Sequence, residues 1–463
     1  MQTALSVSLE AEATRSRIAK SGDSLRIQRR KTPKLRVRFD PADPKRASDC
    51  KVTPAILGNH MAIHSFLKRQ IHQPTKFEFA ASINRPGYQA SERLIIQHAR
   101  DRELLAHVQV QPQSMRFGST EIPIARLRHF AMLPEYRHQG YDFRLLDAAE
   151  TEAKSQGAML CVSRGSDYGL LSKHGWVSVG NDPVSIVSPR RLMGQLPAPA
   201  EPESPFYAAQ MPQYFVRIGR LTDVDALQSL YEDHVSSHYG TQVRNDEYWS
   251  WLVKRGSHHR IYLFFESDKP RAYVVVNGAG VLEIVDSTED GRGAARLFEQ
   301  VGADAIDQGR HSLRIHCPIA DPIHQWADQA GGNLHVGELE ESWMVKIPSV
   351  RTLLRRLAPE MFKRQKKQDV VQDLSVRIGN EEIRIVRGVR SMKVTRGEAK
   401  RHRVGLTQKA AAQLLLGYRS VDELASQKML VASTDEALQT TRILFPALNL
   451  WRPVWDDASI VRH

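Results

Sequence analysis

Cysteine and long apolar runs are scarce in this sequence. The three cysteines, Cys50, Cys161 and Cys317, are odd in number and far apart, which argues against a disulfide framework and a cysteine metal site. No stretch approaches the ~20 apolar residues that span a bilayer, and the N-terminus lacks the apolar core of a signal peptide. We therefore expect a cytoplasmic protein without a membrane span.

Acidic residues are outnumbered by basic ones. The net charge is +13 and the pI is about 9.6, which suits an anionic small-molecule ligand and also nucleic acid. Histidine ligands for a metal are not indicated, because His258 and His259 are adjacent rather than spaced along one helix face. We therefore expect an anionic partner and no metal.

The basic residues gather near the N-terminus. Seven of them lie between residues 24 and 38, with no acidic residue among them. This stretch has no apolar periodicity, and no aromatic residues interleave with it as they do on surfaces that stack on single strands. We predict a solvated, flexible basic arm over residues 1–50. Nucleic-acid binding by this arm is a third functional hypothesis with charge as its only support, and we do not expect it.

A strand, a glycine turn and a helix follow one another in the N-terminal half. The apolar stretch 124–133 ends before Pro134, and Gly140 precedes a segment with apolar residues at helical spacing. The helix is expected to end at Gln156-Gly157, because glycine tolerates a positive φ. Its apolar positions are Phe143, Leu146, Ala149 and Ala153. The turn places unpaired N–H groups at the positive end of the helix dipole, which predicts a diphosphate site.

The same turn resembles motif A of the GCN5-related N-acetyltransferases (GNAT), whose Arg/Gln-x-x-Gly turn holds the pyrophosphate of acetyl-CoA. Here the turn reads Arg137-His138-Gln139-Gly140, and Gly175-Trp176 resembles the later Gly-Phe of the family. The resemblance implies direct acetyl transfer from acetyl-CoA to an amine. The cofactor-binding residues that it implies are Met132 and Leu133 for the pantetheine arm and the acetyl carbonyl, Arg137, His138, Gln139, Gly140 and Tyr141 for the pyrophosphate, and Ser166 and Asp167 beside the cofactor.

Composition and element order divide the rest of the chain. We predict an α/β (α+β) fold with a first acetyl-CoA-binding domain over 51–197, a proline-rich linker over 198–213, a second domain over 214–348, a third over 349–455 and a tail over 456–463. The second domain repeats the entry order of strand, loop and helix. Its stretch from Asp290 lacks Arg-x-x-Gly, so we predict a degenerate copy with a structural role. Ser433 and Glu436 predict a capping box at the start of the last helix.

The third domain resembles the closing domain of the enhanced intracellular survival (Eis) acetyltransferases, which is similar to sterol carrier proteins. The residues that carry the resemblance are Leu414-Leu-Leu-Gly-Tyr-Arg-Ser-Val-Asp-Glu-Leu424 and Leu444-Phe-Pro446. It implies two tandem GNAT folds followed by a sterol-carrier-protein-like α+β domain. It also implies amine acceptors, aminoglycosides and lysines among them, and assembly as a homo-hexamer.

Two catalytic positions depart from the family pattern. The tyrosine that serves the family as general acid falls on Leu171. Tyr168 reaches the same volume if this segment is a helical turn, or it is a partly buried ring with its hydroxyl at water. The family's base, the C-terminal carboxylate, belongs here to His463, unless this end is frayed and solvated. Asp456 and Asp457 are alternative bases, or they only solubilise the tail.

A third departure is Asp142 in the glycine turn. Its carboxylate opposes a diphosphate unless it points away, and in the first helical turn it also favours the dipole. The leading hypothesis is an N-acetyltransferase, slow or rewired, that uses acetyl-CoA as co-substrate and acts on a small-molecule or lysine-type amine. The alternative is a non-catalytic protein on the same scaffold that binds acyl-CoA or an apolar ligand.

Overall fold

The computed structural model describes residues 50–98, 102–137, 139–164, 168–197, 213–236, 238–337, 342–366 and 370–458. Almost all of the predicted basic arm and of the predicted linker lies outside these ranges, as do the site residues His138, Ser166, Asp167 and His463. Among the described helices, none has the length and apolar character that crossing a lipid bilayer requires.

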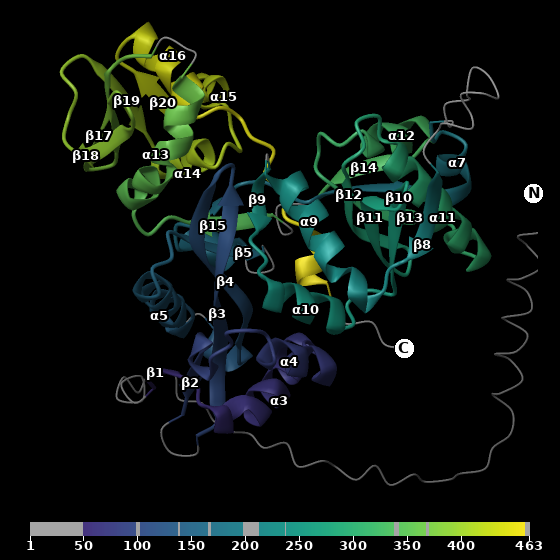
Figure 1. The fold of residues 1–463 in the computed structure, drawn as a ribbon. Helices are drawn as coiled ribbons and strands as arrows, with labels where there is room; N and C mark the ends of the chain where they lie inside the picture. The colour runs from purple at the N-terminus through teal and green to yellow at the C-terminus, as the bar shows by residue number, and fades with distance from the viewer. Residues whose placement is uncertain are drawn as a thin grey trace, which may run out of the picture. The chain divides into compact units, whose positions relative to one another are not determined.

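The first sheet carries the predicted strand–turn–helix motif (Figure 1). Its strands run in the order β1-β2-β3-β4-β5-β15-β6, and β9 pairs with β3. Their bounds are β1 Val52–Pro54, β2 Arg93–Gln97, β3 Leu104–Phe117, β4 Thr120–Met132, β5 Leu160–Arg164, β6 Val177–Ser178, β9 Tyr239–Gln242 and β15 Trp343–Lys346. The helices of this part are α3 His60–Ile71, α4 Lys76–Ile83, α5 Tyr141–Ser155 and α6 Tyr168–Lys173, with the 3₁₀ turns η1 Leu57–Asn59, η2 Ala90–Glu92 and η3 Pro134–Tyr136.

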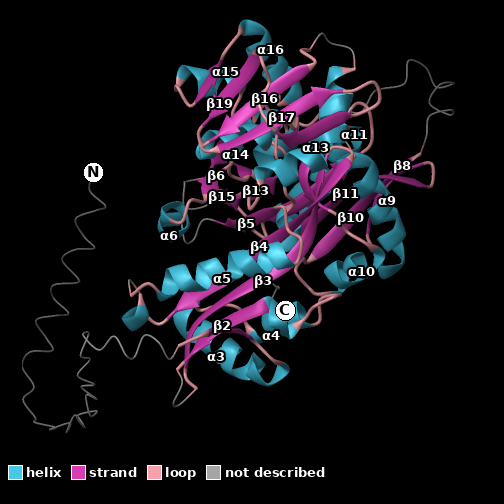
Figure 2. Ribbon diagram, turned by 90° about the vertical axis from the view of Figure 1, so that its left-hand side faces the viewer, coloured by secondary structure: helices cyan, strands magenta, loops and turns pink. Residues whose placement is uncertain are grey.

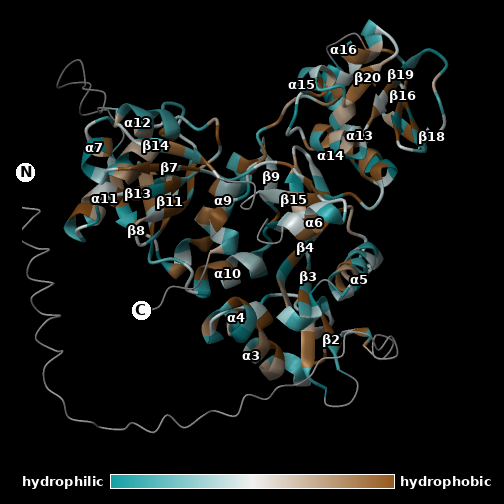
Figure 3. Cartoon of the chain, turned by 180° about the vertical axis from the view of Figure 1, so that it is seen from behind, coloured by the Kyte–Doolittle hydropathy of each residue, from teal (hydrophilic) through white to brown (hydrophobic). Residues whose placement is uncertain are grey.

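Alternation along β2 explains how helices cover both faces of this sheet. Leu94 and Ile96 pack in the cluster that contains the apolar face of α5, whereas Ile95 packs against α3 and α4. Successive strand residues point to opposite faces, so one strand serves two helical layers. Hydrophobic and hydrophilic residues alternate along α5 (Figure 3), as in a helix with one buried face.

The second sheet has the order β14-β7-β13-β12-β11-β10-β8. Its strands are β7 Pro183–Val187, β8 Tyr214–Ile218, β10 Arg260–Glu266, β11 Lys269–Asn277, β12 Gly280–Asp286, β13 Leu313–His316 and β14 Asn333–Val336. Its helices are α7 Pro189–Met193, α9 Val224–Val235, α10 Asp246–Lys254, α11 Arg292–Asp307 and α12 Ile323–Gln329, with the 3₁₀ turn η5 Leu221–Asp223. Along β10, Tyr262 and Phe264 face α11, whereas Leu263 packs with α9 and α10.

The two sheets exchange strands. β7 follows the first sheet along the chain, yet it pairs with β13 and β14 of the second. β15 follows the second sheet, yet it inserts between β5 and β6 of the first. Each sheet is therefore completed by a strand from the other half of the chain. In Figure 2, β15 lies beside β5 and β6, the two strands with which it pairs.

The third sheet has the order β18-β17-β16-β19-β20. Its strands are β16 Asp373–Ile378, β17 Glu381–Arg387, β18 Met392–Arg396, β19 His402–Leu406 and β20 Leu430–Ala432, and its helices are α13 Val350–Gln365, α14 Gln408–Leu415, α15 Val421–Ser426 and α16 Asp435–Leu444. A last 3₁₀ turn, η7, spans Val454–Asp457. This α+β unit shares one apolar cluster with the first sheet, including Phe117 and Leu353.

The predicted α/β (α+β) fold class is confirmed by three sheets that are each combined with helices. The predicted capping box at Ser433 and Glu436 is wrong. Thr434 caps α16 by accepting the N–H of Ala437, one residue later than expected. The Ser433 hydroxyl instead donates to the carbonyl of Arg401 and accepts the N–H of Arg403. Its side chain therefore binds the backbone at the start of β19 and not the start of α16.

Candidate functional site

The backbone pairing of β4 with β5 ends early, and we call the unpaired stretch of β4 beyond it the slot. The parallel pairing covers only Ile124 to Arg126 on β4 and Leu160 to Val162 on β5, while β4 continues along β3 as far as Met132. From Leu127 onward β4 forms no ladder with β5, although the Ser163 hydroxyl donates to the Leu127 carbonyl at 3.3 Å. Parallel strands that separate leave backbone donors and acceptors for an extended ligand.

The chain leaves β4 through a turn that glycine makes possible. Leu133 and η3 lead to Gly140, which has φ +82° and is the N-cap of α5. A side chain at this φ is strained whatever the space around it. Within the turn, Gln139 donates its side-chain amide to the carbonyl of Glu135 at 2.6 Å. The predicted residues Leu133, Arg137, Gln139, Gly140 and Tyr141 thus form one continuous turn beside the end of β4.

The first amides of α5 lie open. Among the described residues, the backbone N–H groups of Tyr141 and Asp142 have no hydrogen-bond acceptor. The Asp142 carboxylate accepts the N–H of the next residue, Phe143, at 3.0 Å and is 9% exposed. Asp142 is therefore turned toward the backbone of the first helical turn, but it binds neither of the two open amides.

Tyr168 and Leu171 lie on the same short helix, α6, but in different surroundings. Leu171 is 3% exposed and belongs to the apolar cluster beneath α5. Tyr168 opens the helix, is partly buried and packs on the edge of the same cluster, which also contacts Leu133 and Tyr136. A tyrosine at position 171 would therefore bury its hydroxyl, whereas Tyr168 lies at the rim of the cluster.

A bulge in β4 turns two neighbouring side chains to one side. The β3–β4 register shifts so that His107 pairs with Ala131 and Gln109 with Arg128, and His129 in the extra stretch has φ +51°. In a regular strand Arg128 and His129 would point to opposite faces. Because of the bulge, both line the same pocket.

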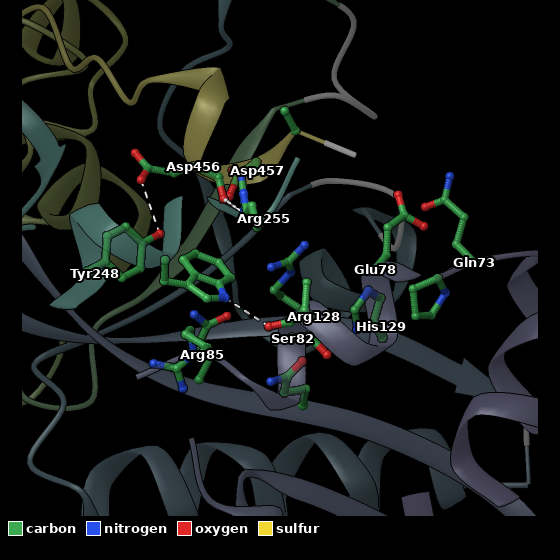
Figure 4. A pocket seen from close by; sticks show the side chains of 16 residues that line it. Gln73, Glu78, Ser82, Arg85, Arg128, His129, Tyr248, Arg255, Asp456 and Asp457 are labelled. Atoms are coloured by element: carbon green, nitrogen blue, oxygen red, sulfur yellow. Dashed lines mark hydrogen bonds between the residues drawn. The ribbon is translucent and has the colours of Figure 1, made fainter. Parts of the chain in front are cut away.

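That pocket has a volume of about 100 Å³ and is formed by five segments (Figure 4). α4, β3, β4, α10 and the η7 turn near the end of the chain contribute to its wall. Arg128 and His129 lie across from Tyr248 and the two aspartates of η7 in Figure 4. The polar and charged lining residues are Gln73, Glu78, Ser82, Arg85, Gln109, Gln111, Arg128, His129, Tyr248, Arg255, Asp456 and Asp457.

Comparison with known proteins identifies the strand–turn–helix part. Residues 62–179 match the family described as acetyltransferase (GNAT) domain. The chain contains a GNAT domain. The slot, the glycine turn and α5 all lie within these residues, so the predicted family is confirmed for this part of the chain. No curated protein matches the sequence.

Solved structures share the fold beyond this GNAT domain. A GCN5-related N-acetyltransferase from Anabaena variabilis ATCC 29413 is similar with a TM-score of 0.68 at 15% identity, covering 87% of this chain and 99% of that one. One from Kribbella flavida has a TM-score of 0.68 at 13% identity, covering 87% and 97%. Eis1 from Mycobacterium abscessus has a TM-score of 0.61 at 12% identity, covering 87% and 99%. At these identities the likeness shows the fold.

The second sheet contains a turn and a helix like those of the GNAT domain, but its helix start is filled. Gly291, with φ +73°, is the N-cap of α11. Asp290 accepts the N–H of Arg292 at 3.2 Å, Thr288 that of Gly293 at 3.1 Å, and Asp286 that of Ala294 at 2.7 Å. The chain's own side chains thus occupy the positions at which an anionic ligand would bind.

The aspartates of η7 are held in ion pairs. Asp456 is 2% exposed and accepts Arg244 at 2.9 Å and the Tyr248 hydroxyl at 3.2 Å. Burial alone would raise its pKa, but the charges of Arg244, Arg452 and Arg255 outweigh burial and lower the pKa of Asp456. Asp457 is paired with Arg126 on β4. Neither residue is a solvated tail residue, and neither is a free base.

His129 stays neutral in this setting. Burial first, and then the charges of Arg128 and Arg93, lower its pKa well below the ordinary value. Its Nδ1 is buried and has no hydrogen-bond partner among the described residues. A neutral imidazole with an unpartnered ring nitrogen is able to form a hydrogen bond with a ligand in this polar pocket.

A small acid–histidine cluster lies outside the slot. The ligand atoms of Asp147, Glu150 and His174 lie within 4.8 Å of one another. His174 contacts Asp147 at 2.8 Å, and Glu150 binds Lys346 at 2.7 Å and accepts the Trp176 indole N–H at 2.8 Å. These partners connect α5, β15 and the loop after α6, so the cluster is explained as a structural brace.

The family pattern predicted residues of the glycine turn and of the end of β4, whereas most residues of the pocket were not predicted. Met132, which is 2% exposed, and Leu133 both pack with the apolar cluster beside α5. Glu78, Arg128, His129 and Tyr248 were not predicted, because they come from separate segments with no local motif. A weak signal existed at the tail, where Trp451 and Trp455 indicated burial; both are buried.

Proposed function

We propose that this chain is an acyltransferase that moves the acetyl group of acetyl-CoA directly to an amine. The observation that carries the proposal is the pair of open amides at the start of α5, next to the slot where β4 and β5 separate. A helix start with free N–H groups favours a diphosphate, and the unpaired edge of β4 suits a pantetheine arm. The match of residues 62–179 to an acetyltransferase family supports the same chemistry.

In this proposal the cofactor is held by the residues predicted from the family pattern. Met132 and Leu133 hold the pantetheine arm and offer a backbone N–H to the developing oxyanion. Arg137, Gln139, Gly140 and Tyr141 hold the pyrophosphate, together with His138, Ser166 and Asp167 outside the described residues. The acceptor occupies the pocket on the other face of β4, where Arg128 and His129 project.

His129 serves as the general base in place of the aspartates and of His463. The amine nitrogen attacks the thioester carbonyl, its proton passes to His129, and the C–S bond breaks to release the thiolate. The lowered pKa of His129 keeps the ring unprotonated before the reaction. Tyr168, at the start of α6, donates a proton to the departing thiolate.

Several features remain predictions: the cytoplasmic location and the domain boundaries, which rest on the sequence pattern, and the homo-hexamer and the likeness of the third sheet to sterol carrier proteins, which rest on the family resemblance. The second sheet is proposed to be a structural copy, because its helix start is filled by Asp286 and Thr288. A lysine-type or small-molecule amine is the proposed acceptor.

Calorimetric titration with acetyl-CoA, followed by an assay of thiol release with a panel of amines, tests the proposal. We expect micromolar binding and slow release. Replacing Tyr168 with Phe should lower kcat by about 10²-fold while the affinity for acetyl-CoA stays the same. Replacing His129 with Gln should lower kcat similarly and flatten the acidic limb of the pH profile. Binding without release for any amine would favour the non-catalytic alternative, and no binding would refute the assignment.

A further inference from the structure

The pocket beside the β4 bulge contains a cation without an anionic partner. Arg128 lines it and is partly buried, and among the described residues it has no hydrogen bond or ion pair. Burial, and then the nearby charge of Arg255, lower the pKa of Arg128 to about 10. A guanidinium in these surroundings remains charged at neutral pH, and an unpaired buried charge is costly until an anion binds.

The other charged side chains of the pocket already have hydrogen-bond partners. Arg85 binds Glu92 at 2.5 Å, and Arg255, which also has no ion pair among the described residues, donates to the carbonyl oxygens of Trp455 and Asp456. Asp456 and Asp457 are paired with Arg244 and Arg126. Glu78 accepts the N–H of Thr75 at 2.6 Å in the cap of α4. Among the described lining residues, Arg128 is thus the arginine whose guanidinium donates no hydrogen bond, and it is left for an anionic ligand.

An unsatisfied acceptor lies next to this unsatisfied donor. Gln109 is 2% exposed, and its Nε2 donates to Glu92 at 3.3 Å, which fixes the orientation of the amide. Its Oε1 is buried and has no hydrogen-bond partner among the described residues. Gln109 and Arg128 are directly paired across β3 and β4, so their side chains share one face of the sheet.

These groups together complement an amine and a carboxylate at once. The Arg128 fork suits the two oxygens of a carboxylate. Gln109 Oε1 and the neutral His129 ring suit the N–H groups of an amine. A cavity of about 100 Å³ is smaller than an engineered cavity of ~150 Å³ that holds benzene, so it admits a small molecule or one end of a larger one.

We propose that the acceptor is an amino carboxylate: Arg128 binds its carboxylate, while Gln109 and His129 receive its amine. This rests on the proposed acetyl transfer and specifies the acceptor class for the same site. The product is then an N-acetyl amino carboxylate. A polycationic amine without an acidic group would place like charge beside Arg128 and is a poor acceptor.

Matched acceptors that differ only in the acid test the proposal. Thiol release is measured with L-alanine against L-alaninamide, and with 4-aminobutanoate against butylamine. We expect kcat/KM to favour at least one carboxylate by roughly 50-fold, because a site built to bind a group rejects the analogue that lacks it. L-alaninamide has a more acidic ammonium group than L-alanine, so a larger fraction of it is the neutral amine at a given pH. This difference in reactivity works against the expected preference for the carboxylate.

Variants separate the pocket from the cofactor site. Arg128→Gln should remove the preference, lowering kcat/KM for the carboxylate roughly 50-fold and changing it for the amide less than threefold. Arg128→Lys should restore part of it, since lysine keeps the charge but not the fork. Arg384→Gln is the matched control, an exposed arginine on β17 paired with Asp373. Acetyl-CoA affinity should be equal in all of these variants.

The outcomes distinguish the two proposals. Equal rates for acids and amides would overturn the amino carboxylate and leave acetyl transfer standing. Failure to bind acetyl-CoA would overturn acetyl transfer, and direct calorimetric titration of L-alanine and of 4-aminobutanoate into the wild-type protein and Arg128→Gln would then decide about the pocket. A heat of binding with L-alanine or 4-aminobutanoate that disappears in Arg128→Gln supports the amino carboxylate site. The absence of such a heat overturns it.

Discussion

The two turn–helix units of this chain use the same backbone for opposite purposes. Gly140 and Gly291 both precede their helices with a positive φ, of 82° and 73°. At α5 the first two amides have no acceptor among the described residues, whereas at α11 the first three bind Asp290, Thr288 and Asp286. The same geometry therefore leaves an uncapped helix start in one unit, the proposed anion site, and a capped helix in the other.

The difference between the units concerns stability as well as binding. A side-chain cap contributes about 0.5–2 kcal/mol, so the filled end of α11 stabilises the second sheet. The open end of α5 forgoes most of this contribution and depends on a ligand for it. Duplicated units can thus divide into one that binds and one that supports, through a few residues before the helix.

The largest effect is expected from enlarging the two glycines. Gly140→Glu should abolish acetyl-CoA binding, a loss of roughly 10³-fold or more, because it adds a carboxylate where the pyrophosphate binds. Gly291→Glu carries the same backbone strain in the second unit and should leave the affinity unchanged. Calorimetric titration of both variants, with circular dichroism to verify folding, makes the comparison. Equal losses in the two variants would show that the units do not differ as described.

A second comparison of the first two sheets uses the dependence of their stability on pH. Burial lowers the pKa of His107 to about 3 in the first sheet and that of His316 to about 4 in the second. Below pH 6.5 the unfolded chain protonates both while the folded protein does not, so stability falls as the pH drops from 6.5 toward 4. Each histidine should contribute up to about 1.4 kcal/mol per pH unit.

Replacing His107 or His316 with Gln should reduce the pH dependence of the free energy of unfolding by the contribution of that histidine. Because the sheets exchange β7 and β15, we expect one unfolding transition that responds to both variants. Urea unfolding measured between pH 7 and 4.5 provides the slopes. Two separate transitions, each sensitive to one histidine only, would contradict this coupling of the units.

The smallest effect is expected from removing the helix acids. Asp286→Ala leaves an amide of α11 without its acceptor and should destabilise the protein by about 1–2 kcal/mol. Asp142→Ala should cost less, about 0.5 kcal/mol, and should raise the acetyl-CoA affinity severalfold by removing a negative charge. Thermal unfolding and calorimetry measure the two quantities. A larger destabilisation by Asp142→Ala would mean that the α5 end is a structural cap as well.

The strand–turn–helix was predictable because its signals are local. The spacing of Leu146, Ala149 and Ala153 gave α5, and Gly157, with φ +80°, follows its end as expected. The bulge at His129 has no such signal, since it depends on how β3 and β4 align over many residues. Without the bulge, no sequence pattern places Arg128 and His129 on one side.

The pocket was unpredictable for a related reason. Its wall joins α4, β3, β4, α10 and η7, which are far apart in the chain. The sequence pattern offered Asp456 as a base or as a solubilising tail residue, but the residue is buried and paired with Arg244. No local pattern predicts this pair, because the two residues lie more than 200 positions apart in the chain. Contacts of this kind become visible only when the sheets are assembled.

The exchange of β7 and β15 also limits how this chain can be divided. A fragment ending near residue 197 would keep β7 without the β13 and β14 strands that it pairs with. The same fragment would lose β15, leaving β5 with an open edge and β6 without its partner. Open edges invite pairing with other chains. The part of the chain that matches the GNAT domain is therefore not a transferable module: shuffling or excision at the apparent linker would yield two incomplete, aggregation-prone halves.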